Sequence, residues 1–207
     1  MPENQPTLFG NVEERNGART TPPSKLPEGF KYQPDVITLD EERELVRHIE
    51  PLPFKEFEFH GFTGKRRVVS FGWRYDYGER GLQRANDIPP FLMPLRERAA
   101  QFAGLGANDF QHVLITEYSP GAAIGWHRDK AVFAEVVGFS LLSAAKFRLR
   151  RKRGDSYERI TITAEARSAY LLSGPSRTEW EHSIPAVDRL RYSITFRNFR
   201  EEKSVIP

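Results

Sequence analysis

Residues 110–150 read FQHVLITEYSPGAAIGWHRDKAVFAEVVGFSLLSAAKFRLR, and this stretch decides the predicted fold. Short runs rich in β-branched and aromatic residues are separated by Gly, Pro, Asp and Ser, a pattern typical of successive short strands. Similar runs continue further along the chain. The predicted strands are Val113–Tyr118, Val136–Leu142, Ala145–Arg150, Arg159–Thr163, Ser168–Leu172 and Arg191–Arg197.

Two helices are predicted before these strands. Thr38 and Glu41 fit a capping box at the start of the first helix, and Pro51 ends it. The second helix is expected to begin near Pro89 and to stop at Gly104. Two helices followed by many short strands predict an α+β, mainly β architecture. It would be a β-sandwich or a jelly roll with the helices packed outside.

The chain has 207 residues, a length that suggests one domain. Residues 1–28 are rich in Pro and polar residues and are interpreted as a flexible tail, whereas 29–200 form the domain. No stretch approaches the roughly 18 apolar residues of a membrane span, and no secretory signal is visible. We therefore expect a soluble, cytoplasmic monomer that has no membrane partner.

Charge and cysteine content limit the chemistry. The formal net charge of +3 permits an acidic partner but does not require one. The absence of cysteine excludes disulfides, thiolate metal sites and cysteine nucleophiles. Any metal site must therefore use carboxylates and the five histidines.

One set of residues has the chemistry of a metal centre. In His127-Arg128-Asp129 the first and third side chains of an extended chain point the same way, so both could bind one ion. His182 is the best candidate for a third ligand. Two histidines and one carboxylate on one side of an ion form the facial triad of non-haem Fe(II) oxygenases. The alternative is that each is an ordinary hydrogen-bonded structural residue, as we interpret His60 and His112, whereas His48 is expected on the surface of a helix.

Two predicted strands present polar faces that suit a carboxylate ligand. In residues 191–197 the polar side chains alternate with apolar ones, and Arg191 and Arg197 share the polar face. Arginine offers a bidentate fork to a carboxylate, such as those of 2-oxoglutarate. Thr116 and Tyr118 likewise share one face of their strand. The alternative is that both strands are simply half-buried, with the polar face in water or satisfied locally.

Together these motifs resemble the AlkB family of Fe(II)/2-oxoglutarate-dependent dioxygenases. The resemblance rests on LITEYSPG at 114–121, on the His-x-Asp motif, on His182, and on the Arg-x5-Arg spacing that begins at Arg191. It covers residues 112–199. It implies a double-stranded β-helix (jelly roll) at 111–200, preceded at 29–110 by helices and a substrate-recognition lid.

The resemblance also implies cofactors and a reaction. Fe(II) would be bound by His127, Asp129 and His182, which would be both metal ligands and catalytic residues, and O2 would be a cosubstrate. 2-Oxoglutarate would be bound by Arg191 and Tyr118, with Thr116 and Arg197 in the same pocket. The family oxidises N-methyl groups on nucleobases and releases formaldehyde, succinate and CO2. We therefore expect oxidative demethylation of N-alkylated bases in DNA or RNA, as in alkylation damage repair.

Other substrates and functions stay open at this stage. Lys130-Ala131-Val132 follows the His-x-Asp motif where some DNA-repair members have acidic residues. An AlkB-like oxygenase that acts on a protein or a small molecule is therefore the alternative. A non-catalytic jelly-roll module is a third hypothesis, which the complete set of motifs disfavours.

Two segments are candidates for nucleic-acid binding. Aromatic and basic residues between 60 and 78 resemble a lid in which a flipped base is stacked, and the alternative is a hairpin packed in the core. The basic run 146–153 could bind a phosphate backbone, or could be a solvated charged hairpin. The predicted substrate-binding residues are Phe62, Lys65, Trp73, Tyr75, Tyr77, Arg148 and Arg150.

A short motif in the tail suggests a protein partner. Gln5-Pro6-Thr7-Leu8-Phe9 is similar to the Gln-x-x-Leu-Phe peptides that bind bacterial sliding clamps. Two apolar anchors in a disordered tail can dock into a pocket on binding. The alternative is a tail segment that packs on its own domain.

Overall fold

The computed structural model describes residues 26–59, 62–76 and 81–200, apart from the side chains of 57–59, 62–64, 74–76 and 82. Its elements, in chain order, are β1 (Phe30–Gln33), α1 (Leu39–Ile49), β2 (Lys55–Phe59), β3 (Phe62–Phe71), β4 (Trp73–Asp76), β5 (Gly81–Arg84), η1 (Pro90–Leu92), α2 (Met93–Ala103), η2 (Ala107–Asp109), β6 (Phe110–Tyr118), β7 (Ile124–His127), β8 (Phe133–Leu141), β9 (Ala145–Arg153), β10 (Ser156–Ala164), β11 (Ala169–Leu172), α3 (Gly174–Thr178), β12 (Glu181–Ile184) and β13 (Arg191–Phe199).

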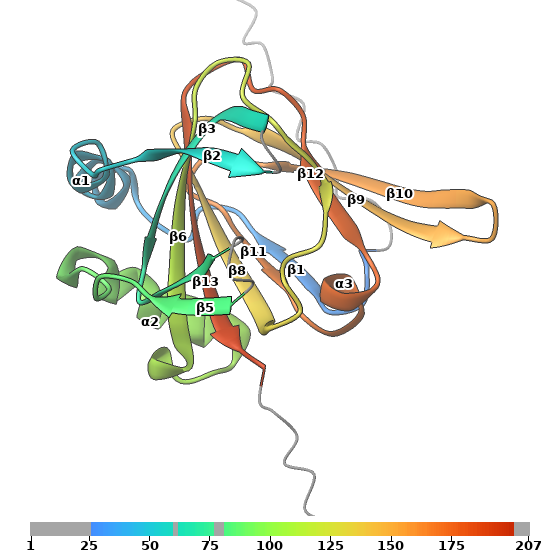
Figure 1. Ribbon diagram of the computed structural model, residues 1–207, viewed down its shortest axis with the longest axis horizontal. Coiled ribbons are helices and arrows are strands. Elements are labelled where there is room, and N and C mark those ends of the chain that lie inside the picture. Colours follow the sequence, from blue (N-terminus) through green and yellow to red (C-terminus); the bar gives the residue numbers. More distant parts are fainter. Residues whose placement is uncertain (1–25, 60–61, 77–80, 201–207) are drawn as a thin grey trace, which may run out of the picture.

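Two antiparallel sheets build the body of the molecule (Figure 1). The large sheet has seven strands in the order β1-β11-β8-β13-β6-β3-β2, and the small sheet has four in the order β10-β9-β12-β7. The hairpin of β9 and β10 projects from the body. Strands β4 and β5 form a separate two-stranded ribbon. The predicted mainly β jelly roll is confirmed.

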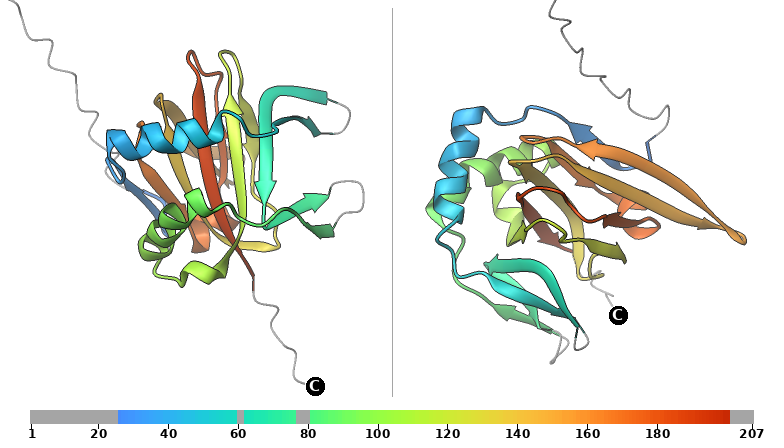
Figure 2. Two further views of the ribbon diagram at one scale, coloured as in Figure 1. Left: turned by 90° about the vertical axis from the view of Figure 1, so that its left-hand side faces the viewer. Right: turned by 90° about the horizontal axis from the view of Figure 1, so that it is seen from above.

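Helices α1 and α2 cover one face of the large sheet (Figure 2). Thr38 caps α1 as predicted: its hydroxyl accepts from the backbone N–H of Glu41, and the Glu41 carboxylate accepts from the N–H of Thr38. Helix α2 ends at Gly104, whose φ of 75° is in the left-handed region that glycine tolerates. The buried helix residues, including Leu45, Ile49 and Leu95, pack on the outward side chains of the large sheet in one apolar core.

A second core lies between the sheets. It joins side chains of the large sheet, such as Tyr118 and Tyr170, to Phe147 and Leu149 of the small sheet. The polar residues of the inner faces gather beside this core, so the interface between the two sheets contains the site described below.

The predicted and observed elements differ in several places. Strands β6, β8, β9, β10 and β13 are longer than predicted because ladder pairing continues beyond the predicted ends. Strands β1–β5 were not predicted, and neither were β7 and β12, which have four residues each, too few for a clear alternation. None of the described helices is long and apolar enough to cross a membrane.

Candidate active site

Strands β7 and β12 bring two histidines face to face at the edge of the small sheet. His127 is the last residue of β7, and it lies directly opposite His182 in the antiparallel register. The two ring centroids are 4.2 Å apart. The His182 ring also stacks on Phe147, at 5.4 Å, which holds it on the inner face of the sheet.

Asp129 follows His127 by two residues and points to the same place. Its Oδ2 is 3.8 Å from Nε2 of His182. Its Oδ1 accepts two hydrogen bonds from Arg197, from Nε at 3.1 Å and from Nη2 at 2.9 Å. Oδ2 is buried and has no hydrogen-bond partner in the described part of the chain. A buried carboxylate oxygen is costly to leave unpaired, so this atom is suited to bind a cation.

The protonation of the three side chains also suits a metal ion. Burial, followed by the nearby His127, lowers the pKa of His182 to about 3, and burial lowers the pKa of His127 as well. Burial alone would raise the pKa of Asp129, but Arg197 and the two histidines hold it well below its usual range. At neutral pH the set is therefore two neutral imidazoles and a carboxylate, the forms that bind metal.

The tautomer of His127 follows from one hydrogen bond. Its Nδ1 lies 2.9 Å from the carbonyl oxygen of Gly125, which can only accept. Nδ1 therefore carries the proton, and Nε2 keeps its lone pair for an ion.

The three side chains are slightly more open than a loaded site requires. Among the described residues, no three His, Asp or Glu side chains already have the geometry to hold a metal ion. Nitrogen and oxygen donors about 2.1 Å from one ion would stand roughly 3–3.5 Å apart. The 3.8 Å between Asp129 and His182 exceeds this modestly, so an ion would draw the donors together.

Arg191 is a buried cation with unused hydrogen-bonding capacity. Its Nε donates to Oγ of Ser140 at 2.9 Å, and its Cζ lies 5.1 Å from the ring centroid of Tyr118. The residue is 0% exposed, and both terminal nitrogens lack a partner within the described residues. A buried guanidinium fork with two free donors matches a carboxylate.

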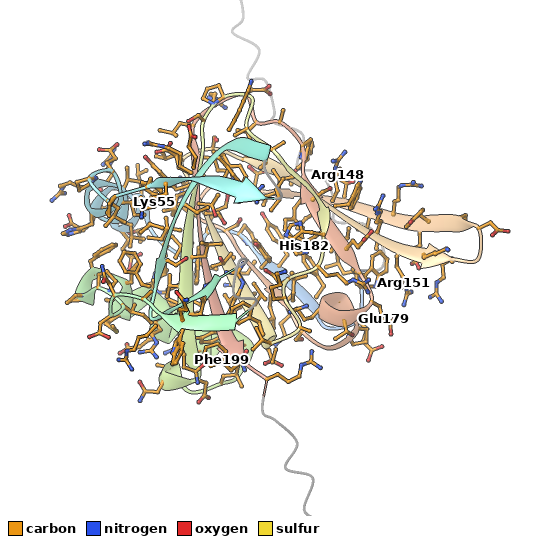
Figure 3. The ribbon with its side chains drawn as sticks, viewed as in Figure 1. Lys55, Arg148, Arg151, Glu179, His182 and Phe199 are labelled. Atoms are coloured by element: carbon orange, nitrogen blue, oxygen red, sulfur yellow. The ribbon has the colours of Figure 1, made fainter. Side chains whose placement is uncertain are left out.

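A cavity of about 1450 Å³ connects these groups. It is lined by His127, Asp129 and His182 from one side and by residues of the large sheet, among them Thr116 and Tyr118, from the other. Tyr118 lines the cavity, and its ring lies against the guanidinium of Arg191, which is not itself a lining residue. Figure 3 shows His182 between the two layers.

Comparison with known proteins assigns the family. The sequence model of the protein family described as the 2OG-Fe(II) oxygenase superfamily matches residues 35–197 of this chain. The chain belongs to this superfamily. Members of this superfamily use Fe(II), 2-oxoglutarate and O2.

Its relatives include several AlkB homologues. It is 27% identical over 198 residues to the "Alkylated DNA repair protein ALKBH8 homolog" of Arabidopsis thaliana, which covers 83% of this chain and 56% of the relative. It is 24% identical over 183 residues to the "tRNA (carboxymethyluridine(34)-5-O)-methyltransferase ALKBH8" of Macaca fascicularis, covering 86% of this chain and 27% of the relative. The "Alpha-ketoglutarate-dependent dioxygenase alkB homolog 4" of Mus musculus is 27% identical over 206 residues, which cover 81% of this chain and 66% of the relative. The chain thus spans little more than half the length of the Arabidopsis relative and about a quarter of the length of the macaque relative.

Solved structures share the fold. "The structure of OsALKBH1" superposes with a TM-score of 0.62 at 18% identity, covering 84% of this chain and 100% of that one. A Pseudomonas putida prolyl-4-hydroxylase superposes with a TM-score of 0.58 at 15% identity, and the match covers 84% of this chain and 94% of that one.

The residues predicted to bind substrate in this oxygenase lie in different places. Trp73 packs edge-on against Phe199, at 5.7 Å, and lines a smaller cavity of about 290 Å³ instead of the large one. Lys65 is exposed on β3. The side chains of Phe62 and Tyr75 lie outside the described residues, as do Tyr77 and the tail motif Gln5–Phe9.

Several residues of the site were not predicted from the sequence. Ser140 orients Arg191, and the role of Arg197 as a partner of Asp129 adds to its predicted place near the cosubstrate. Arg177 is buried, and its Nη2 donates to the carbonyls of Lys130 at 2.5 Å and Phe133 at 2.9 Å, which ties α3 to the loop after Asp129. These partners are 44 or more residues away in sequence, so no local pattern could have shown them.

Proposed function

We propose that His127, Asp129 and His182 hold the Fe(II) of this oxygenase. The observation that carries the proposal is the buried, unpaired Oδ2 of Asp129, which lies beside two neutral imidazoles. Arg197 occupies the other oxygen of the same carboxylate, so it fixes the side chain and leaves one oxygen for the ion. Three protein ligands on one side leave positions for the two cosubstrates.

The 2-oxoglutarate site in this proposal centres on Arg191. Its two free nitrogens would bind the carboxylate that lies away from the metal, and Tyr118 and Thr116 line the approach. Ser140 holds the guanidinium plane through Nε, so the fork is oriented before the ligand arrives. When bound, the iron and 2-oxoglutarate supply the oxidation of a C–H bond by O2; the protein binds, orients and excludes water.

We further propose that the substrate is an N-alkylated base in DNA or RNA. Besides Arg197, the cavity is lined by the basic residues Lys55, Arg66, Arg84, Arg128 and Lys130, against the acidic residues Glu56 and Asp129. Apolar side chains such as Leu114 and Ile124 line its walls, which suits a flat base with a charged backbone at the mouth. The names of the AlkB relatives support the same class. Hydroxylation of an N-methyl group would release formaldehyde, with succinate and CO2.

Mass spectrometry on methylated oligonucleotides tests this function. Single- and double-stranded DNA and RNA carrying N-methylated bases are incubated with protein, Fe(II), 2-oxoglutarate and O2. We expect a loss of methyl mass from at least one of them, and none with Asp129→Ala. Asp155→Ala, at the exposed tip of the β9–β10 hairpin, removes a carboxylate far from the cavity and is the matched control.

The alternative substrate classes give a different result. An oxygenase for a protein or a small molecule would form succinate from 2-oxoglutarate but leave every oligonucleotide unchanged. A chain that forms no succinate under any of these conditions would contradict the proposed iron site itself.

A further inference from the structure

The outer face of the small sheet carries an ordered array of cations and aromatic rings. The register of β9 with β10 is regular over nine residue pairs, so residues 146, 148, 150 and 152 share one face with 157, 159, 161 and 163. Phe147 and Leu149 point the other way, into the core between the sheets. The array consists of the exposed residues Lys146, Lys152, Tyr157 and Arg159 and of the half-buried residues Arg148 and Arg150.

Two of these arginines reach across β12 to one tryptophan. Nε of Arg148 donates to Oγ of Ser183 at 3.0 Å, and Nε of Arg150 donates to Oε2 of Glu181 at 2.6 Å. Both acceptors lie on β12, opposite their arginines in register. The two guanidinium carbons then lie 5.0 Å and 4.5 Å from the ring centroid of Trp126 on β7.

The arrangement leaves the binding edges of both guanidinium groups unused. Arg148 and Arg150 make their side-chain hydrogen bonds within the described residues through Nε alone, so the terminal nitrogens stay available. Arg150 is further fixed between two rings, because its Cζ lies 4.6 Å from Tyr157 as well. Side chains immobilised in this way lose little entropy when an anion binds.

The charge of this face is not balanced internally. Glu181 neutralises Arg150, whereas the one hydrogen bond of Arg148 to a described residue goes to the hydroxyl of Ser183. By contrast, the arginines of the opposite face of the hairpin are paired: Arg151 with Glu158 and Glu179, and Arg153 with Glu158. Figure 3 shows Arg148 and Arg151 on opposite sides of β9, with Glu179 beside Arg151.

Trp126 connects this face with the catalytic cavity. It precedes the proposed iron ligand His127, and it is one of the residues that line the large cavity. An extended ligand that crosses the arginines would therefore reach Trp126, a residue that lines the cavity.

We infer that the face formed by Trp126, Arg148, Arg150 and Tyr157 binds the backbone of a single-stranded nucleic acid beside the cavity. The inference rests on the proposed nucleic-acid substrate and specifies how it is held. Alternate residues on β9 are about 6.6 Å apart, a spacing that suits consecutive phosphates of an extended strand. The rings of Trp126 and Tyr157 stack with unpaired bases, which a duplex does not offer.

Binding of unmethylated oligonucleotides tests the inference without turnover. Fluorescence anisotropy is measured with labelled single strands of RNA and DNA and with a duplex, over a range of salt. We expect Arg148→Gln/Arg150→Gln to weaken single-strand binding at least tenfold and to lower the salt slope by about two phosphates. The matched control is Arg151→Gln/Arg153→Gln, which removes two charges from the same strand on the opposite face and is expected to bind like the wild type.

Two further measurements separate geometry from charge and folding. Arg148→Lys/Arg150→Lys keeps the charge but not the fork, so we expect binding between that of the wild type and the Gln pair. Trp126→Leu removes the stacking surface and is expected to weaken binding several-fold with an unchanged salt slope. Circular dichroism confirms that each variant is folded.

Several results would overturn the inference. One is an equal loss of affinity in the two double Gln variants. Another is duplex binding that is as tight as single-strand binding and equally weakened by Arg148→Gln/Arg150→Gln. The third is polyglutamate that competes as well as an oligonucleotide of the same length, which would point to an acidic protein segment. If the wild type demethylates oligonucleotides and Arg148→Gln/Arg150→Gln binds them normally, only this inference is contradicted. A wild type that binds through this face but demethylates nothing removes the proposed function alone.

Discussion

At the scale of single residues, the site depends on buried charges that the protein itself leaves incompletely paired. Within the described residues, Asp129 has one oxygen bound to Arg197 and one without a partner, and Arg191 has one nitrogen bound to Ser140 and two without a partner. Such groups are destabilising in the empty protein, because burial removes water without returning every hydrogen bond. They persist where a ligand supplies the missing partners.

Replacing Arg191 by Met separates ligand binding from stability. We expect the affinity for 2-oxoglutarate, measured by calorimetry without O2 in the presence of Mn(II), to fall at least 100-fold, equivalent to about 2.7 kcal/mol. The free energy of unfolding of the metal-free protein should stay the same or rise, because an unpaired buried charge is removed. Arg47→Met, on the exposed side of α1, is the control. A large loss of stability with unchanged affinity would show that Arg191 is only structural.

At the scale of elements, local signals define where helices begin and how strands pack. The capping box of Thr38 and Glu41 starts α1, and Arg98 of α2 binds the same carboxylate. Within the large sheet, Gly138 of β8 lies opposite Tyr170 of β11, and the tyrosine ring crosses over the glycine. The first signal is visible in the four residues from Thr38 to Glu41, whereas the second exists only after the strands pair.

The Glu41 cap predicts a pH-dependent stability. The hydrogen bond from Arg98, and then those from Thr38, lower the pKa of Glu41 from 4.5 to about 2. Because the folded pKa is lowered, the stabilisation is complete above pH 4.5 and is lost as the pH falls towards 2. In urea titrations we expect Glu41→Gln to be less stable than the wild type by about 1 kcal/mol at pH 7, with the difference shrinking below pH 4.5. A difference that does not change with pH would contradict this origin.

A methyl group at Gly138 should disturb the sheet and the cavity together. A Cβ there would lie 2.2 Å from Cζ of Tyr170, which lines the cavity, so the ring must move. We expect Gly138→Ala to lower the free energy of unfolding by about 1–3 kcal/mol. Gly125→Ala is the matched control, since a Cβ at that position meets nothing within 4 Å, and its stability should change by less than about 0.5 kcal/mol.

At the scale of the whole molecule, the site exists only where the two sheets meet. The proposed metal ligands come from the small sheet and the loop after β7, whereas Arg191 and Arg197 come from β13 in the large sheet. Ligands that bind across this interface should therefore stabilise the folded state as a whole.

Thermal unfolding measures this coupling. With Mn(II) and 2-oxoglutarate each at 100 times its dissociation constant, one bound ligand adds about 2.7 kcal/mol. For a protein of this size, each bound ligand should then raise Tm by about 5–10 °C. A chelator should reverse the rise, and Asp129→Ala should not show it. A rise of equal size in Asp129→Ala would place the metal elsewhere.

The sequence by itself determined the local features of this protein. The capping box and the alternation of 191–197 predicted α1 and β13, because helix caps and strand faces depend on residues that are neighbours in the chain. The His-x-Asp spacing paired His127 with Asp129 for the same reason, whereas His182 lies far from them in the chain and was proposed separately as the third ligand. The structure places His127 opposite His182 on β7 and β12, and it places Asp129, in the loop after β7, 3.8 Å from His182.

Only the tertiary structure decided which partners these residues have. The bonds of Arg197 to Asp129, of Ser140 to Arg191 and of Arg177 to the loop after Asp129 each join residues 44–68 positions apart. The contacts of Trp126 with Arg148 and Arg150 were likewise decided by the tertiary structure, because in the sequence these two arginines are only members of a basic run. A local pattern sets the face on which a side chain lies, but strand order and register set what lies opposite, and these depend on how the whole chain packs.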